Sequence, residues 1–178
     1  MKHFSLRGGL AAALLGAALV AGSTFGVSTA SAMADPTSKI NMANQPNVPN
    51  GWVTDYQGAL ELAKKENRPI LLDFTGSDWC GWCKKIDKEI FSTSAFQSYA
   101  KDNLVLLYVD FPNGKPQADA LKAQNEQLQN KFGVRGFPTL VLLDSNGKKI
   151  WENVGYMKGG PDALISAINK AAGKSGDS

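Results

Sequence analysis

Residues 71–85 read LLDFTGSDWCGWCKK, and the rest of the chain can be interpreted from this stretch. It begins as an apolar run typical of a buried strand and continues through a short turn. It ends with two cysteines at the expected start of a helix. Cys80 and Cys83 are three residues apart, so their side chains share one helix face, with Cβ atoms roughly 5–6 Å apart. This spacing permits a disulfide after small adjustments.

The expected helix start also bears on the reactivity of the two thiols. The first turn of a helix has unpaired N–H groups and the positive end of the helix dipole, which favour a thiolate over a thiol. Lys84 and Lys85 add positive charge nearby. We therefore expect Cys80 to be the attacking thiolate and Cys83, one turn further along, to be the resolving thiol.

Two other interpretations of the cysteine pair stay open. A structural zinc site needs four ligands, and the chain offers only these two cysteines and one histidine, His3. An inert disulfide is the second alternative, but so short a loop constrains the unfolded chain very little. The sequence favours a redox pair, and we expect no metal and no cofactor besides the Cys80–Cys83 disulfide.

Residues 1–34 have the pattern of a secretory signal peptide: a basic start, a short Ala/Leu core over 10–20, and small residues before a cleavage site. We expect cleavage near Ala32 or Ala34. The core is short and rich in alanine and glycine, which argues against a membrane span, although an uncleaved anchor stays an alternative.

The expected mature chain has almost balanced charge. Loss of Lys2 and Arg7 leaves 17 basic against 16 acidic residues, a formal charge of +1, so neither nucleic acid nor an anionic membrane is expected as a partner. Residues 35–52 are rich in proline and asparagine and predict a tether, and 173–178 predict a flexible tail. One domain over 53–172 is long enough for its own core, and we expect a monomer.

The remaining pattern alternates helices and strands. Asn-Gly between two apolar runs is a strong hairpin signal, and Thr54 or Asp55 precedes the first helical pattern as a cap. In the helix expected over 117–132, we expect the packing face to contain Ala120, Leu121, Leu128 and Phe132. In chain order the expected elements are a helix to about residue 67, strand 70–74, the cysteine helix to about 90, helix 94–100, strand 104–109, helix 117–132, strands 139–143 and 148–154, and a helix from 161.

This order of elements is similar to the thioredoxin fold, an α/β fold with a central mixed sheet of four to five strands flanked by helices. Residues 79–84, WCGWCK, resemble the thioredoxin motif W-C-G-P-C-K with Trp82 in place of proline. Residues 132–139, FGVRGFPT, resemble the segment that carries the family's cis-proline. The resemblance covers about residues 53–172.

The resemblance implies roles for three reactive side chains. Cys80 would be the nucleophile and Cys83 the resolving cysteine. Asp73 would match a buried carboxylate behind the second cysteine, where desolvation raises its pKa and lets it take the proton from Cys83. The alternative is that Asp73 is a solvated residue at the end of its strand.

The resemblance also implies a substrate-binding surface. Pro138 would be the cis-proline facing the cysteines, and the backbone of Phe137 and Thr139 beside it would pair with an extended substrate.

The residues around the cysteines complete this expected surface. Trp79 is expected to pack beside the pair, and Gly81 separates Cys80 from Trp82. We expect the Trp82 side chain to point outward and contact substrate, with local packing as the alternative.

The chain departs from cytosolic thioredoxin in three ways. One extra residue separates Asp73 from the cysteines, strand 104–109 lacks the family's inward lysine, and the segment 110–138 is longer. These features resemble exported bacterial thioredoxin-like proteins.

The expected function is therefore an exported thiol–disulfide oxidoreductase, periplasmic or secreted. We expect above all a disulfide reductase that acts through a mixed disulfide on Cys80, with isomerase or oxidase as alternatives. A non-catalytic thioredoxin-fold binding module with a structural disulfide is the alternative of another class. Protein substrates with cysteines or disulfides and a membrane dithiol electron donor are the expected partners.

Overall fold

A five-stranded mixed sheet forms the centre of the computed structural model, which describes residues 48–174. The strand order is β1-β3-β2-β4-β5. The first three of these strands run parallel, whereas β4 is antiparallel to β2 and to β5. This is the thioredoxin fold that the sequence predicted. The strands are β1 (Trp52–Val53), β2 (Ile70–Thr75), β3 (Val105–Asp110), β4 (Thr139–Leu143) and β5 (Lys149–Val154).

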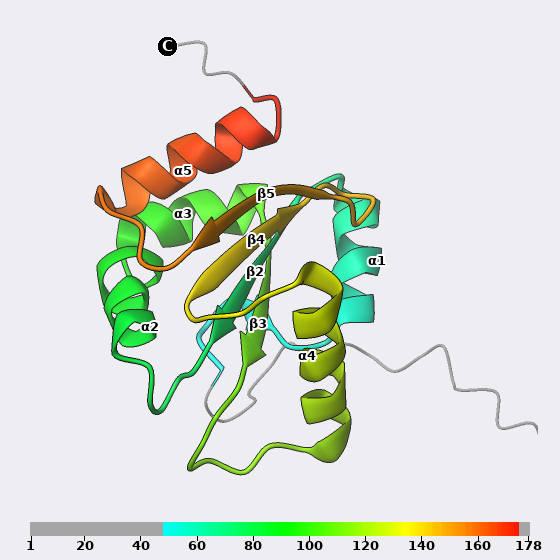
Figure 1. Cartoon of the computed structure of the whole chain (residues 1–178). Coiled ribbons are helices and arrows are strands. Elements are labelled where there is room, and N and C mark those ends of the chain that lie inside the picture. Colours follow the sequence, from blue (N-terminus) through cyan, green and yellow to red (C-terminus); the bar gives the residue numbers. More distant parts are fainter. Residues whose placement is uncertain (1–47, 175–178) are drawn as a thin grey trace, which may run out of the picture. The chain divides into compact units, whose positions relative to one another are not determined.

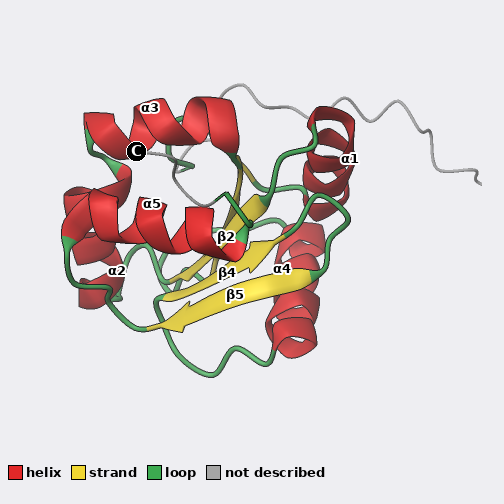
Figure 2. Ribbon diagram, turned by 90° about the horizontal axis from the view of Figure 1, so that it is seen from above, coloured by secondary structure: helices red, strands yellow, loops and turns green. Residues whose placement is uncertain are grey.

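Helices cover both faces of the sheet. Figures 1 and 2 show α1 and α4 on one side, with α2, α3 and α5 on the other. The α-helices are α1 (Tyr56–Glu66), α2 (Gly81–Ile86), α3 (Ser94–Asn103), α4 (Asp119–Phe132) and α5 (Gly160–Ala171). A π-helical turn, η1 (Asp87–Phe91), continues α2, so the cysteine helix extends about as far as the sequence predicted. Within residues 48–174, no helix is long and apolar enough to cross a membrane.

Strand β2 lies in the middle of the sheet and is buried along its whole length. Because side chains alternate between the faces of a strand, Ile70, Leu72 and Phe74 pack under α1 and α4, and Leu71 points to the side of α2, α3 and α5. Asp73 therefore also points to the α2 side. The alternation thus directs the one carboxylate of this apolar strand toward the cysteine helix.

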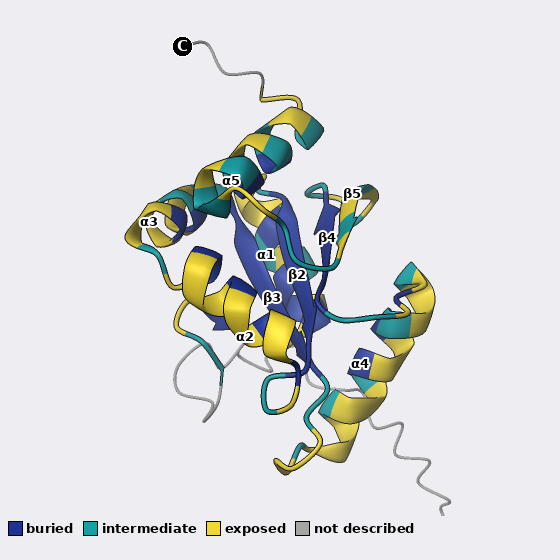
Figure 3. Cartoon of the chain, turned by 60° about the vertical axis from the view of Figure 1, so that its left-hand side comes forward, coloured by how far each residue is buried: buried dark blue, intermediate teal, exposed yellow. Residues whose placement is uncertain are grey.

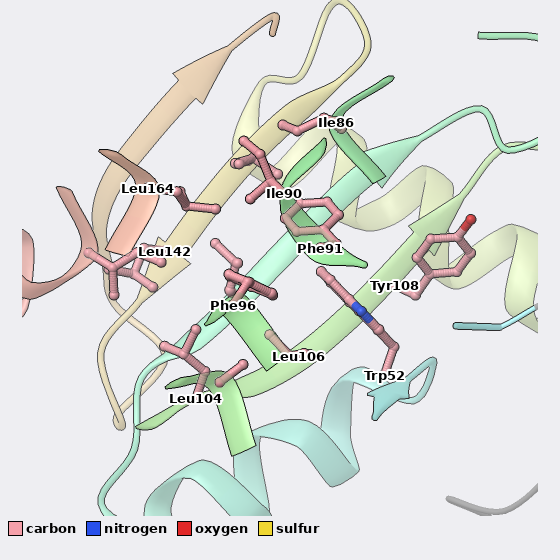
Figure 4. Packing of buried hydrophobic residues seen from close by; sticks show 14 residues of the cluster. Trp52, Ile86, Ile90, Phe91, Phe96, Leu104, Leu106, Tyr108, Leu142 and Leu164 are labelled. Atoms are coloured by element: carbon pink, nitrogen blue, oxygen red, sulfur yellow. The ribbon is translucent and has the colours of Figure 1, made fainter. Parts of the chain in front are cut away.

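The core on the α2 side is rich in aromatic residues (Figure 4). The Trp52 ring stands edge-on to Phe91 and to Tyr108, with centroid distances of 5.0 and 6.0 Å. Such edge-to-face pairs add stability beyond their buried area. Trp52 thereby anchors the start of the described chain beneath the cysteine helix.

This anchoring corrects the expected tether over 35–52. Trp52 forms strand β1 and is buried, and Val48 packs against the same core. The ordered fold therefore begins before residue 53, because the sheet has room for one more short parallel strand beside β3. The signal peptide expected over 1–34 and the tether as far as residue 47 lie outside the described residues.

Helix α4 corrects one residue of the packing face that the sequence predicted. Ala120 is exposed, whereas Asn125 is buried and its amide donates to the carbonyl oxygen of Asp110 at 2.9 Å. Leu128 is buried as expected. Phe132 also packs against the core and Leu121 is half-buried, so the expectation fails only at Ala120. Asn125 joins this face because its buried amide satisfies a backbone acceptor that lies where β3 ends.

Candidate active site around the Cys80–Cys83 disulfide

The two cysteines form a disulfide at the start of α2. Their Cα atoms are 5.2 Å apart, and both side chains are buried, Cys80 to 6% and Cys83 to 3% exposure. Cys80 is the N-cap residue of α2, and its Sγ accepts a hydrogen bond from the backbone N–H of Cys83 at 3.1 Å. The sulfur of Cys80 thus occupies the position at which unpaired helix N–H groups stabilise negative charge.

Asp73 lies on the same side of the sheet as Cys83, and both line a small cavity. The cavity has a volume of about 50 Å³, and Asp87 and Tyr108 also border it. Asp73 is 3% exposed, so the alternative of a solvated strand end is wrong. Its Oδ1 atom has no hydrogen-bond partner among residues 48–174.

Burial raises the pKa of Asp73 well above its usual value, and the negative charges of Asp87 and Asp110 raise it further. Burial also raises the pKa of Asp87, although a hydrogen bond from Ser92 opposes the shift. The pKa of Tyr108 is likewise raised, first by burial and then by the neighbouring carboxylates. The cavity therefore contains carboxyl groups that hold their protons more tightly than exposed ones.

Sequence reasoning missed Asp87, Tyr108 and Asp110 at this site. One local signal was present, because Asp87 is four residues after Cys83 and so lies on the same helix face. Tyr108 is opposite Asp73 in the register of β2 and β3, and no local pattern reveals that pairing.

The Phe137–Pro138 peptide bond is cis, as the resemblance implied. Backbone and side-chain hydrogen bonds fix this segment: the N–H of Gly155 donates to the Pro138 carbonyl at 2.8 Å, and the Thr139 hydroxyl donates to the Gly136 carbonyl at 2.8 Å. The cis-proline segment therefore connects directly to the chain that follows β5.

Trp79 brings the cis-proline segment next to the cysteine turn. Its ring meets the Phe137 ring edge-on at 5.7 Å, and Phe137 also packs against Phe111 at 5.1 Å. The Trp79 indole N–H donates to the carbonyl of Phe111 at 2.8 Å. We call Trp79, Phe111 and Phe137 the aromatic wall. Half of the Trp79 surface is exposed, so the wall faces solvent beside Cys80.

Trp82 lies between the two cysteines in the sequence and is 58% exposed. Its ring packs on Tyr156 at 5.7 Å, and the ammonium group of Lys85 lies over both rings. The tyrosine hydroxyl donates to Glu89, which raises the pKa of Tyr156. Trp82 thus has local packing and a large exposed surface together. Figure 3 shows the outer face of α2 as exposed, next to the buried strands.

Gly76 is required by the position of Trp79. A Cβ atom added at Gly76 would lie 2.4 Å from a carbon of the Trp79 ring. We expect Gly76→Ala to displace the ring and to lower the free energy of unfolding by about 1–3 kcal/mol, as overpacking does. Urea unfolding of Gly136→Ala is the control, because a Cβ there meets nothing within 4 Å. Equal losses in the two variants would contradict the prediction.

Among the described residues, no group of three or more histidine, cysteine, aspartate or glutamate side chains has the geometry of a metal site. Asp73, Asp87 and Asp110 are close enough for the negative charges of the last two to raise the pKa of Asp73. They repel one another as like charges. The chemistry that this arrangement supports is proton transfer and thiol exchange at Cys80 and Cys83.

Comparison with known proteins supports the same chemistry. Residues 56–172 match the thioredoxin-like domain family. The disulfide bond reductase DsbH of Chlamydia pneumoniae is 39% identical over 116 residues, which are 65% of this chain and 69% of that protein. The thiol:disulfide interchange protein DsbD of Photorhabdus laumondii is 37% identical over 89 residues, which are 50% of this chain but only 14% of DsbD.

A solved structure agrees with these relatives. The DsbH oxidoreductase structure superposes with a TM-score of 0.64 and 35% sequence identity, and the match covers 74% of this chain and 93% of that one. The chain therefore belongs to the thioredoxin-like domain family and is one of its thiol–disulfide oxidoreductases.

Proposed function

We propose that the protein is an exported disulfide reductase that acts through a mixed disulfide on Cys80. The observation that carries this proposal is the Cys80–Cys83 disulfide at a helix start, with Cys83 and the buried Asp73 bordering one cavity. The name of the relative DsbH, a disulfide bond reductase, supports the same direction of electron flow.

The proposed reaction begins from the reduced protein. The Cys80 thiolate attacks one sulfur of a substrate disulfide, the substrate S–S bond breaks, and one substrate thiolate leaves. Cys83 then loses its proton and attacks the Cys80 sulfur. The mixed disulfide breaks, the second substrate thiolate leaves, and the Cys80–Cys83 disulfide forms. Two electrons have passed from the cysteine pair to the substrate.

Asp73 is the proposed acceptor of the Cys83 proton. An ionised carboxylate in a buried cavity has a strong tendency to bind a proton, since burial and the charges of Asp87 and Asp110 disfavour its charged form. The cavity of about 50 Å³ is large enough for a water molecule, so the proton can pass directly or through one water.

The surface beside the cysteines fits an extended protein substrate. The backbone next to cis-Pro138 is the proposed strand-like partner of the substrate chain. Trp79 and Trp82, each adjacent in sequence to a cysteine of the pair, both expose aromatic surface. Large aromatic rings are typical anchors of binding surfaces, and we propose that both contact the chain that carries the disulfide.

Electrons must reach the protein from another dithiol. A reductase outside the cytoplasm needs a donor that carries electrons across the membrane, so we propose a membrane dithiol protein as its partner and the cysteine pair itself as its only redox centre. The similarity to part of the interchange protein DsbD supports a role in such a relay.

Insulin reduction tests the proposal. With dithiothreitol as the electron source, the protein should accelerate insulin reduction at catalytic concentrations. No acceleration at any dithiothreitol concentration would favour the alternative of a non-catalytic binding module.

Covalent capture of a partner by the Cys83→Ala variant, in an extract of exported proteins, would then identify the client and the donor.

The redox potential separates reductase from oxidase or isomerase. The strongly oxidising members of the fold place a histidine between the cysteines, whereas Gly81 and Trp82 add no charge there. The Lys84 ammonium is bonded to the Asp78 carbonyl, and that of Lys85 lies over two rings.

The thiolate is therefore only moderately stabilised in the reduced protein. We expect a potential near that of thioredoxin, about −270 mV, rather than the roughly −120 mV of strong oxidants. Equilibration with glutathione buffers, followed by tryptophan fluorescence, measures it. A value above about −160 mV would assign the protein to oxidase or isomerase.

A further inference from the structure

We propose that Asp78 is a positioning residue that holds the segment 111–115 against the cysteine turn and thereby fixes the aromatic wall for substrates with a large apolar side chain beside their disulfide. This inference rests on the proposed function and specifies its substrate class. Trp79 is adjacent to Cys80 and Phe137 to cis-Pro138, so the wall is continuous with the reactive site.

The Asp78 carboxylate binds the backbone of the segment after β3. Its two oxygens accept the N–H of Asn113 at 3.0 and 3.1 Å, and one of them also accepts the N–H of Gly114 at 2.6 Å. These bonds lower the pKa of Asp78, with a smaller contribution from the charge of Lys115. Hydrogen bonds to an ionised acceptor are stronger than neutral ones.

The residues on both sides of Asp78 bind the same part of the chain. The backbone N–H and hydroxyl of Ser77 donate to the Asp110 carboxylate at 2.9 and 2.7 Å, and the Trp79 indole donates to Phe111. Ser77, Asp78 and Trp79, three consecutive residues of the cysteine turn, thus form hydrogen bonds with residues 110–114. The Ser77 bonds reach Asp110, which precedes Phe111, and the Trp79 bond reaches Phe111 itself. Of these three residues, only Asp78 binds the chain beyond Phe111.

Phe111 itself is held by the bond of its N–H to the Thr75 carbonyl at 2.9 Å and by the Trp79 indole, and the Asp78 bonds hold the chain that follows it. Phe111 packs on Phe137 at 5.1 Å, and Trp79 completes the wall through its contact with Phe137. Without the Asp78 carboxylate the segment after Phe111 has no side-chain partner on the cysteine turn. The chain after Phe111 then gains freedom, and the Phe111 side of the wall is held less firmly.

The wall selects by apolar contact. When a substrate chain pairs with the backbone beside Pro138, the side chains that flank its reactive disulfide lie next to the aromatic wall. A large apolar side chain removes aromatic surface from water there, whereas a small polar one gains nothing. A rigid wall binds better than a mobile one, because less freedom is lost on binding.

Two disulfide-linked peptides that differ only in the residue beside the cysteine, phenylalanine or serine, test the proposal. For the unaltered protein, kcat/KM should be higher for the phenylalanine peptide. In Asp78→Ala the ratio of the two kcat/KM values should fall about tenfold, the order of magnitude that charge-assisted hydrogen bonds contribute. An unchanged ratio, or a starting ratio of one, would overturn the proposal.

Asp144→Ala is the matched control. Asp144 also accepts two backbone N–H groups, those of Asn146 and Lys148, both at 2.9 Å, but it does so in the turn between β4 and β5. The substitution removes a similar pair of carboxylate-to-backbone hydrogen bonds from a different turn. The ratio of the two kcat/KM values should therefore stay as in the unaltered protein. A fall equal to that in Asp78→Ala would show that general loosening of turns is the cause, and would reject the proposal.

A binding measurement keeps the proposal separate from the proposed function. The indole N–H resonance of Trp79 reports the bond to Phe111. It should shift when a cysteine-free phenylalanine peptide is added to the oxidised protein, and should shift less in Asp78→Ala. Absence of a shift would overturn the aromatic wall as a binding surface, whether or not the protein reduces insulin. Absence of insulin reduction alone would reject only the reductase function.

Discussion

Cys83→Ala should convert the protein from a turnover catalyst into a covalent trap. Cys80 keeps its position at the start of α2 and can still attack a substrate disulfide, but no thiol remains to resolve the product. Insulin reduction at catalytic concentrations should fall by roughly a hundredfold or more, since what remains depends on external thiol. Non-reducing electrophoresis and mass spectrometry should show one substrate chain bound to each protein molecule.

Cys80→Ala is the matched control for this trap. The remaining thiol, Cys83, lies one turn inside the helix and is almost fully buried. This variant should lose turnover to the same extent and should trap no substrate. Alkylation of the reduced protein at different pH values adds a second check, because Cys80 should react at or below neutral pH while Cys83 is protected. Equal trapping by both variants would contradict the assignment of nucleophile and resolving thiol.

The sequence predicted the fold well because its strongest signals are local. The continuous apolar run of β2, the Asn-Gly turn before β5 and the capping Asp55 each report the conformation of a few neighbouring residues. The cysteine spacing is of the same kind. The cis bond at Pro138 was implied by the family resemblance rather than by any local pattern.

The contacts that shape the site are non-local, and the sequence did not reveal them. Tyr108 reaches Asp73 through the register of two parallel strands, and Asp78 reaches Asn113 across 35 residues. The expected face of α4 was wrong at Ala120 and omitted Asn125, whose burial follows a hydrogen bond rather than hydrophobicity. A polar side chain with a buried backbone partner has no signature in a hydrophobic pattern.

The buried carboxyl group of Asp73 should make the stability of the protein depend on pH. Its pKa is raised by burial first and by Asp87 and Asp110 second, so the folded protein holds this proton to a higher pH than the unfolded chain does. Between the two pKa values the unfolded state has released the proton and the folded state has not. Stability therefore falls as pH rises through this window, and each unit of the shift costs about 1.4 kcal/mol.

Asp73→Asn removes this cost. The quantity to compare is the free energy of unfolding of the variant minus that of the unaltered oxidised protein. This difference should be more positive at neutral pH than at pH 3, where Asp73 is protonated in both the folded and the unfolded chain. Urea unfolding at the two pH values gives this difference and cancels the pH-independent effect of a buried amide. Asp102→Asn, at an exposed position of α3, should follow the pH dependence of the unaltered protein. A parallel course of the Asp73→Asn and unaltered curves would show that the carboxyl group does not titrate differently on folding.

The same substitution should slow catalysis at one step. Attack of Cys80 on a substrate does not need Asp73, whereas resolution needs a base that accepts the Cys83 proton. In single-turnover experiments Asp73→Asn should slow the release of the mixed disulfide by roughly a hundredfold, the lower end of general base catalysis, and should change its formation much less. The release rate of the unaltered protein should increase with pH through the raised pKa of Asp73, and this step should disappear in the variant. Greater stability at neutral pH together with slower release would identify Asp73 as a group that costs stability because the reaction needs it, whereas unchanged rates in both half-reactions would make it a bystander.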